Sequence, residues 1–256
     1  MLRPRIIPTL LLKNQGLVKG IKFKDYRYVG DPINAVKIFN DKEVDELLFL
    51  DITATREKRG IDLELVQKIA DECYMPFSVG GGIRTIEEMR DILSAGAEKI
   101  SINTIAVTNP SIISNASDIF GSQSVIVSVD FKKTWLGKYR VFTHSGTVKT
   151  SLDPLEWAKK AASLGAGEIY LNSIDRDGTM EGYDLDFIKT VTKAVKIPVI
   201  AAGGAGSLND FSKAIHQAGA SAVSAGSLFV FHGKRRAVLI SYPSKEEINK
   251  NGITLQ

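Results

Sequence analysis

Ile197-Pro-Val-Ile-Ala-Ala-Gly-Gly-Ala-Gly206 is an apolar run that stops on two glycines, and the helix-start pattern Ser207-Leu-Asn-Asp210 follows it. The same order of features occurs half a chain earlier, in Met75-Pro-Phe-Ser-Val-Gly-Gly-Gly-Ile-Arg84 before Thr85-Ile-Glu-Glu88. Glycine lets a backbone approach an anion closely, and the helix start behind it offers free N–H groups and a positive dipole end. The two copies therefore predict two anion sites and a ligand that carries two phosphates.

The composition is that of an ordinary globular protein. With 44% hydrophobic and 24% charged residues over 256 positions, the chain can bury one large α/β core or two small ones. No apolar run reaches the roughly 20 residues that span a bilayer. The net charge of +4 comes without a basic tract interleaved with aromatics, so we expect neither a membrane nor a nucleic-acid partner. A single cysteine, Cys73, and a start without a signal-peptide pattern favour a cytoplasmic location.

Apolar runs and helical patterns alternate along the chain. The expected strands cover residues 5–12, 46–51, 77–79, 99–103, 124–130, 168–173, 198–202 and 221–225. Strands that are apolar throughout are typical of parallel sheets with both faces covered. This alternation and the half-length repeat favour a (β/α)8 TIM barrel with a two-fold half-barrel repeat over a doubly wound open sheet. We expect one domain over residues 1–256, with half-barrels at approximately 1–121 and 122–240.

The connecting segments are predicted from their cap and turn signals. Asp31-Pro32 starts a helix that runs to about Asp41, because aspartate is a good N-cap and proline fits the first helical position. Further helices are expected at residues 61–73, 85–95, 110–119, 153–164, 184–195 and 207–218. Residues 13–30 are expected to form a long functional loop, and residues 131–150 a small hairpin.

The carboxyl ends of the barrel strands are where an active site is expected. Two acidic residues there, Asp130 and Asp177, are candidate general acids or bases, because a carboxyl in a partly dehydrated barrel mouth can have a raised pKa. Asp130 can instead pair with Lys132 or Lys19, and Asp177 can instead structure a turn. One phosphate site is expected at Gly82, Asn103 and Thr104, and the other at Gly178, Gly204, Gly226 and Ser227.

Metal and cofactor chemistry is not indicated. His144, His216 and His232 lack the spacing of metal ligands. Neither a nucleophile triad nor a dinucleotide fingerprint stands out in the sequence. We therefore expect neither a metal nor another cofactor.

Charged residues begin several of the expected strands and so fall on the opposite face of the barrel. They are Arg5, Glu46, Lys99 and Glu168. Such charged residues at the bottom of a barrel usually form salt bridges that stabilise the fold. Two acids and two bases can also form a gate that closes and opens.

Nearly the whole chain resembles the cyclase subunit of imidazole glycerol phosphate synthase, the HisF family. The shared blocks include Arg5-Ile-Ile-Pro8, Phe49-Leu-Asp-Ile-Thr53, Val79-Gly-Gly-Gly-Ile-Arg84, Lys99-Ile-Ser-Ile-Asn-Thr104, Ser173-Ile-Asp-Arg-Asp-Gly-Thr179 and Ile197–Gly206. The resemblance implies a (β/α)8 barrel with two phosphate sites and a HisH-like glutaminase partner docked at the barrel bottom. It also implies that ammonia from this partner passes a gate to the top. Arg5, Glu46, Lys99 and Glu168 occupy the gate positions, and Lys19 and Asp51 are implied substrate contacts.

The chain departs from this family where the chemistry is expected. In the family, two aspartates at the ends of strands one and five react ammonia with the ribulosyl substrate PRFAR, which yields imidazole glycerol phosphate and the aminoimidazole ribotide AICAR. Asp130 holds the strand-five position, but Leu11 stands at the strand-one position, and leucine cannot transfer a proton. Asn172 stands where a threonine is usual and Ala202 where a serine is usual.

These departures, together with a divergent tail over residues 229–256, resemble a narrower group, the HisF-like paralogue of surface-polysaccharide genes. That resemblance implies a subunit that receives ammonia through the barrel and delivers it to a separate sugar amidotransferase. The final step would convert an acetamido to an acetamidino group in lipopolysaccharide or O-antigen biosynthesis. One alternative is a working cyclase of histidine biosynthesis, in which Asp177 or Asp51 replaces the missing carboxylate. Another is a different two-phosphate barrel, such as the family's isomerase relative.

Overall fold

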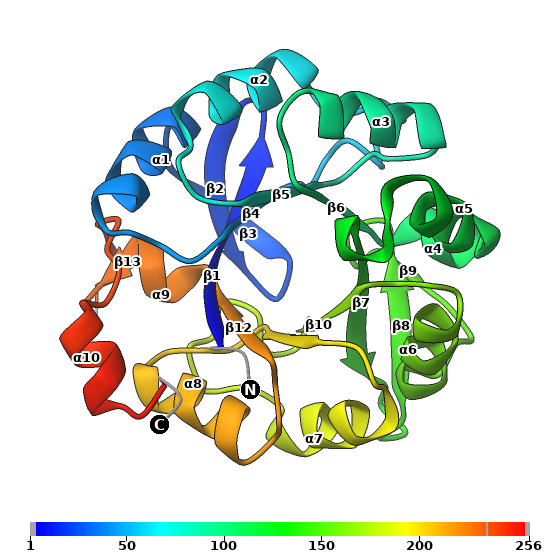
Figure 1. The fold of residues 1–256 in the computed structure, drawn as a ribbon. Coiled ribbons are helices and arrows are strands. Elements are labelled where there is room, and N and C mark those ends of the chain that lie inside the picture. The colour runs from blue at the N-terminus through cyan, green and yellow to red at the C-terminus, as the bar shows by residue number, and fades with distance from the viewer. Residues whose placement is uncertain (1–3, 234, 254–256) are drawn as a thin grey trace.

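The computed structural model describes residues 4–233 and 235–253, which form a closed barrel of parallel strands surrounded by helices (Figure 1). In chain order the barrel strands are β1 (Arg5–Lys13), β4 (Leu47–Asp51), β5 (Phe77–Gly80), β6 (Lys99–Ile102), β7 (Val125–Lys133), β10 (Glu168–Ser173), β11 (Val199–Ala202) and β12 (Ala222–Ala225). Each strand pairs in parallel with the next, and the pairing of β12 with β1 closes the ring. The predicted (β/α)8 TIM barrel is confirmed.

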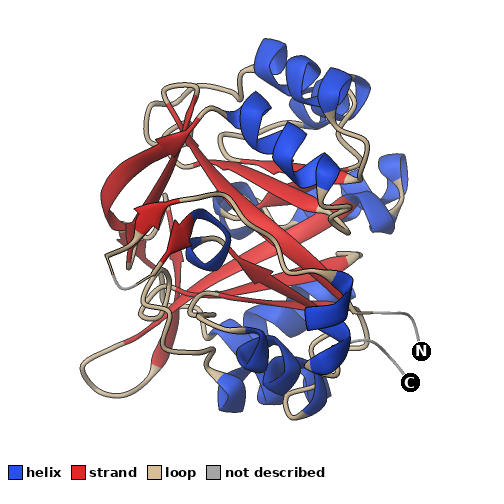
Figure 2. Cartoon of the chain, turned by 90° about the vertical axis from the view of Figure 1, so that its left-hand side faces the viewer, coloured by secondary structure: helices blue, strands red, loops and turns tan. Residues whose placement is uncertain are grey.

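Helices cover the outside of the barrel (Figure 2). They are α1 (Pro32–Asp41), α2 (Leu63–Glu72), α3 (Ile86–Ser94), α4 (Thr104–Thr108), α5 (Ser111–Phe120), α6 (Pro154–Ser163), α7 (Leu185–Ala194) and α8 (Leu208–His216), with a 3₁₀ turn at Ser122–Ser124. The predicted start of α1 is confirmed, since the Asp31 carboxylate accepts a hydrogen bond from the Asn34 N–H at 2.9 Å. No helix within the described ranges is long and apolar enough to cross a lipid bilayer.

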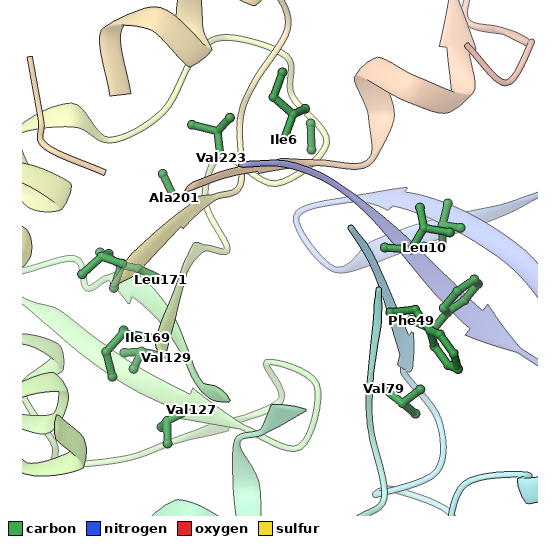
Figure 3. Packing of buried hydrophobic residues seen from close by; sticks show 14 of the residues in the cluster. Ile6, Leu10, Phe49, Val79, Val127, Val129, Ile169, Leu171, Ala201 and Val223 are labelled. Atoms are coloured by element: carbon green, nitrogen blue, oxygen red, sulfur yellow. The ribbon is translucent and has the colours of Figure 1, made fainter. Parts of the chain in front are cut away.

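Alternate residues of the barrel strands face outward and inward, and both faces contribute to an apolar layer in every barrel strand except β5 and β6. Outward-facing side chains such as Ile6, Phe49 and Leu171 pack around the barrel, beneath the helices (Figure 3). Inward-facing side chains form a second, smaller cluster of Ile7, Leu48, Ile126, Tyr170, Ile200, Ala202 and Ala222. Because both faces of every strand are covered, the strands read as continuous apolar runs in the sequence.

The expected long loop at residues 13–30 is wrong. This segment is a hairpin of β2 (Gly16–Ile21) and β3 (Lys24–Gly30), and β2 pairs antiparallel with the end of β1. The glycines that suggested a loop are places of close packing. A Cβ on Gly16 would lie 2.8 Å from the ring of Tyr28, and one on Gly20 would lie 2.2 Å from the Lys24 carbonyl oxygen.

The expected hairpin at residues 131–150 is present. The end of β7 pairs antiparallel with β8 (Tyr139–Thr143), which in turn pairs with β9 (Val148–Lys149). After β12 the chain forms only short elements: helix α9 (Ser227–Val230), strands β13 (Phe231–His232) and β14 (Ala237–Val238), and helix α10 (Lys245–Lys250). The single domain over 1–256 and its division into half-barrels stay predictions.

Candidate functional site

A cavity of about 460 Å³ opens at the carboxyl ends of the barrel strands. Every barrel strand, or the turn that follows it, contributes to the wall, through Leu11, Asp51, Gly81, Asn103, Asp130, Asn172, Gly203 and Gly226. Lys19 and Asp177 line it as well, and so do the remaining expected phosphate ligands, Gly82, Thr104, Gly178, Gly204 and Ser227. The fold therefore gathers the residues that the sequence singled out at the end of the barrel where such sites lie.

Asp130 is held in this cavity by amide groups. Asn172 Nδ2 donates to Asp130 Oδ1 at 3.2 Å, and Asn103 Nδ2 donates to Oδ2 at 3.1 Å. Burial raises the pKa of Asp130 to about 7, with a further push from the Asp177 carboxylate, although the hydrogen bonds from Asn172 and Ser128 oppose it. A carboxyl that titrates near neutral pH can both give and take a proton. The expected alternative of a lysine ion pair fails for Lys19, because that side chain pairs with Asp177.

The raised pKa of Asp130 predicts a pH-dependent stability. Between its ordinary pKa of 3.8 and the folded value of about 7, the folded chain holds a proton that the unfolded chain has lost. The free energy of unfolding attributable to this group therefore falls as the pH rises through that window. Asp130→Asn lacks the titration, so its stability relative to the unmodified chain should increase from about pH 5 to about pH 8 in urea unfolding. A difference that does not change with pH would contradict this, and exposed Asp118→Asn is the control.

Lys19 and Asp177 form a buried ion pair of 3.1 Å between their charged atoms. The hairpin makes this pair possible, because β2 lies against β1 and carries Lys19 over the strand ends. Hairpin residues Phe23 and Tyr26 also line the cavity, and sequence reasoning missed both of them. Burial and the charges of Asp177 and Asp130 raise the pKa of Tyr26, so this phenol is neutral beside two carboxylates. A prediction of paired strands over residues 13–30 would have indicated that these two side chains lie near the cavity.

Leu11 makes the β1 side of the cavity apolar. It is only 7% exposed, and its strand partners are Leu50 on β4 and Val18 on β2. All three are aliphatic, so β1 and its two neighbours offer no proton-transferring group at this level of the barrel.

Asp51 lines the cavity, but its carboxylate is occupied. Arg59 Nη1 donates to Asp51 Oδ2 at 2.7 Å, and the N–H groups of Thr53 and Ala54 each donate to Oδ1 at 3.0 Å. These bonds fix the turn that follows β4. Arg59 was missed in the sequence, since nothing in its local pattern indicates a partner eight residues away.

The first expected phosphate set lies together at the ends of β5 and β6. Gly82 has a φ of +73°, and a Cβ there would lie 2.6 Å from the Arg59 carbonyl oxygen, so the turn requires glycine. Thr104 Oγ1 accepts a hydrogen bond from the His144 N–H at 3.0 Å. Asn103 uses its amide nitrogen on Asp130, and its oxygen remains available to a ligand's donor.

The second set surrounds the end of β12. Gly204 has a φ of +122°, which favours glycine. A Cβ on Gly226 would lie 2.8 Å from Lys19 Nζ, so the backbone of Gly226 lies next to the Lys19 ammonium group in the cavity wall. Arg236 of the tail donates to the Gly178 carbonyl oxygen at 2.7 Å and holds that loop. Several buried polar atoms of the cavity wall have no hydrogen-bond partner within the described part of the chain: Ser101 Oγ, Asn103 Oδ1, Asn172 Oδ1, Asp177 Oδ2 and Ser227 Oγ. Unpaired buried polar atoms are costly, so their grouping here indicates a polar ligand or water.

At the other end of the barrel the four charged residues form a closed ring. Arg5 pairs with Glu46 and, at 2.7 Å, with Glu168, while Lys99 lies 3.1 Å from Glu46 and 2.9 Å from Glu168. The Arg5–Glu168 pair crosses the lumen, because β11 and β12 separate β1 from β10 in the sheet. Burial raises the pKa of Glu168, but the contacts with Arg5 and Lys99 outweigh it and hold the pKa below its ordinary value. We name these four residues the ion-pair ring.

Comparison with known proteins gives a consistent family. A family model described as histidine biosynthesis protein matches residues 5–235. A protein of Leptospira interrogans, provisionally named imidazole glycerol phosphate synthase subunit HisF, is 53% identical over 248 residues, which are 96% of this chain and 98% of its own. One of Pseudomonas aeruginosa, provisionally named subunit hisF2 of the same synthase, is 52% identical over 250 residues, 98% of each chain. The imidazole glycerol phosphate synthase subunit HisF of Alkaliphilus metalliredigens is 48% identical over 232 residues, 91% of this chain and 92% of its own.

Proposed function

The chain belongs to the histidine biosynthesis protein family, among HisF-like subunits of imidazole glycerol phosphate synthase, and from that premise we propose that it conducts ammonia for a separate amidotransferase. A HisH-like glutaminase at the barrel bottom releases ammonia from glutamine. The ammonia passes the ion-pair ring, crosses the lumen and leaves through the cavity. A sugar amidotransferase at the top then uses this ammonia and ATP to convert an acetamido to an acetamidino group in lipopolysaccharide or O-antigen biosynthesis, in the cytoplasm. ATP activates the acetamido oxygen, ammonia forms the new C–N bond, and the oxygen leaves with the transferred phosphoryl or nucleotidyl group.

The apolar cavity wall at the end of β1 is the observation that carries this proposal. Cyclisation by two carboxylates needs a second proton-transferring side chain in the cavity with Asp130, and Leu11 cannot supply it. The ion-pair ring, in contrast, has all of its members in contact. The chain therefore has a complete ion-pair ring at the barrel bottom, which suits a conduit, but it has Leu11 where the family's cyclisation is expected to need a second carboxylate.

The cavity also supports a phosphorylated small-molecule ligand. Ser227 Oγ is buried and unpaired within the described residues, so it can donate a hydrogen bond to a phosphate oxygen without displacing a protein contact. Ser227→Ala should weaken binding of a nucleotide-activated sugar or of inorganic phosphate about tenfold, as expected for one hydrogen bond to a charged group. Calorimetric titration measures the change, and exposed Ser221→Ala is the matched control. Equal affinities for both variants would remove Ser227 from the site.

A cyclase of histidine biosynthesis is the second candidate. It is favoured by Asp130, whose pKa of about 7 suits a general acid or base, and by the synthase names of the relatives. Its second carboxylate would have to be Asp177 or Asp51. Asp177 is engaged by Lys19 and Asp51 by Arg59, so taking up a proton on either carboxylate would weaken an ion pair.

Reconstitution separates the two candidates. The chain is purified with a HisH-type glutaminase and a sugar amidotransferase, and acetamidino product is measured from glutamine, ATP and a nucleotide-activated acetamido sugar. We expect product only when all three proteins are present. In parallel, the chain alone receives PRFAR and ammonium, and we expect no imidazole glycerol phosphate above background. Cyclase turnover without sugar amidation would establish the second candidate instead.

A further inference from the structure

One strand connects the ion-pair ring, the middle of the lumen and the cavity. Because side chains alternate along a strand, Glu168, Tyr170 and Asn172 of β10 all point into the barrel, with roughly 7 Å between successive members. Glu168 belongs to the ion-pair ring, and Asn172 holds Asp130 in the cavity. Tyr170 therefore stands between the two ends of the proposed ammonia path.

The phenol of Tyr170 crosses the lumen. Its hydroxyl lies 3.1 Å from Thr9 Oγ1 and 3.2 Å from Ser224 Oγ, and those two hydroxyls also contact each other. Thr9 is on β1 and Ser224 is on β12, whereas the sheet neighbours of β10 are β7 and β11. A side chain that starts on β10 can reach β12 and β1 at these distances only by spanning the interior of the barrel.

Tyr170 also marks a boundary in polarity. It is 3% exposed, and its partners in the inner cluster are Ile7, Leu48, Ile126 and Ile200. The same side chain lines the cavity together with Thr9 and Ser224. The ring of Tyr170 thus packs on the inner apolar cluster, while its hydroxyl belongs to the polar lining of the cavity.

We propose that Tyr170 is an inner valve of the lumen, which ammonia must displace to pass from the ion-pair ring to the cavity. The inference rests on the proposed ammonia path. Each of its two hydroxyl contacts contributes about 1 kcal/mol net, so the side chain can swing aside thermally. Three neutral hydroxyls at one level can exchange hydrogen bonds with neutral ammonia as it passes, whereas they offer no counter-charge to ammonium.

Variants at this position test the valve in the complete complex of chain, glutaminase and sugar amidotransferase. The readout is the initial rate of sugar amidation with glutamine divided by the rate with ammonium chloride, because ammonium from solution enters at the cavity and bypasses the lumen. Tyr170→Trp overfills the lumen and should lower this ratio about tenfold. Tyr170→Leu removes both the ring and its hydroxyl contacts and should raise the ratio about twofold or more.

Tyr183→Phe is the matched control. Tyr183 is also a buried tyrosine bonded to Ser224, through the backbone carbonyl oxygen at 2.8 Å, but it packs in the outer layer beneath the helices. Its ratio should equal that of the unmodified complex. Equal ratios for folded Tyr170→Trp and Tyr170→Leu would overturn the valve, and Tyr170→Leu alone decides if the tryptophan variant does not fold. If the unmodified complex amidates the sugar with ammonium but not with glutamine, the proposed path fails, and the valve fails with it.

Discussion

Leu11→Asp should raise the rate at which the purified chain converts PRFAR and ammonium into imidazole glycerol phosphate and AICAR by about 10²- to 10⁴-fold. The new carboxyl would line the same cavity as Asp130, whose pKa of about 7 already suits proton exchange. A buried carboxyl between aliphatic neighbours should also have a raised pKa, which favours a general acid. The effect is measured as the rate of product formation by the Leu11→Asp variant and by the unmodified chain, both at saturating ammonium.

Leu11→Asn is the control for this gain. Asparagine has nearly the shape of aspartate and places a polar group among the same neighbours, but it cannot transfer a proton at neutral pH. It should remain at the rate of the unmodified chain. If the unmodified chain turns over PRFAR as fast as Leu11→Asp, the missing carboxylate is not what limits cyclisation, and the conduit proposal loses its main support.

Glu46→Leu should lower the free energy of unfolding by about 3–5 kcal/mol, because it leaves the ion-pair ring with an uncompensated buried positive charge. Glu46 is 2% exposed and accepts from Arg5, Lys99 and the Ser78 hydroxyl. Chemical denaturation of the chain alone measures this cost. In the complex, the same variant should change glutamine-dependent transfer while leaving ligand binding in the cavity intact.

A surface ion pair provides the comparison. Glu43 pairs with Lys245 in water, where both side chains are largely exposed. Glu43→Leu should leave the stability and the glutamine-dependent rate nearly unchanged, since exposed pairs contribute little. A Glu46→Leu variant as stable as Glu43→Leu would show that the ion-pair ring is solvated rather than buried. Unchanged glutamine-dependent transfer would remove its assignment as a gate.

Much of the fold could be predicted because its signals are local. The start of α1 follows from Asp31 and Pro32, and the barrel follows from apolar runs that alternate with helical patterns. The β2–β3 hairpin could not be read in the same way. Its second strand, Lys24-Asp-Tyr-Arg-Tyr-Val-Gly30, is mostly exposed and carries charges, so it does not read as an apolar run. In β2, Gly16 and Gly20 serve close packing against tyrosine rings and backbone rather than a loop.

The site was predictable as a set of residues but not as a set of contacts. Strand ends meet at one mouth in any such barrel, so the gathering of Asp130, Asp177 and the glycines could be expected. Partners depend on how side chains cross the barrel. Only the three-dimensional structure shows that Lys19 pairs with Asp177 rather than with Asp130. The same is true of the hydrogen bonds by which Tyr170 contacts β1 and β12.

The conduit is tested most directly with isotopes. The complete complex receives glutamine labelled with ¹⁵N in the side-chain amide, ATP, the nucleotide-activated acetamido sugar and an excess of unlabelled ammonium. Mass spectrometry then measures the ¹⁵N content of the acetamidino product. If ammonia travels through the barrel, the product should carry ¹⁵N despite the unlabelled pool. Product in which the label is diluted to the composition of the solution would show that the ammonia leaves the complex first, and would contradict the proposed function.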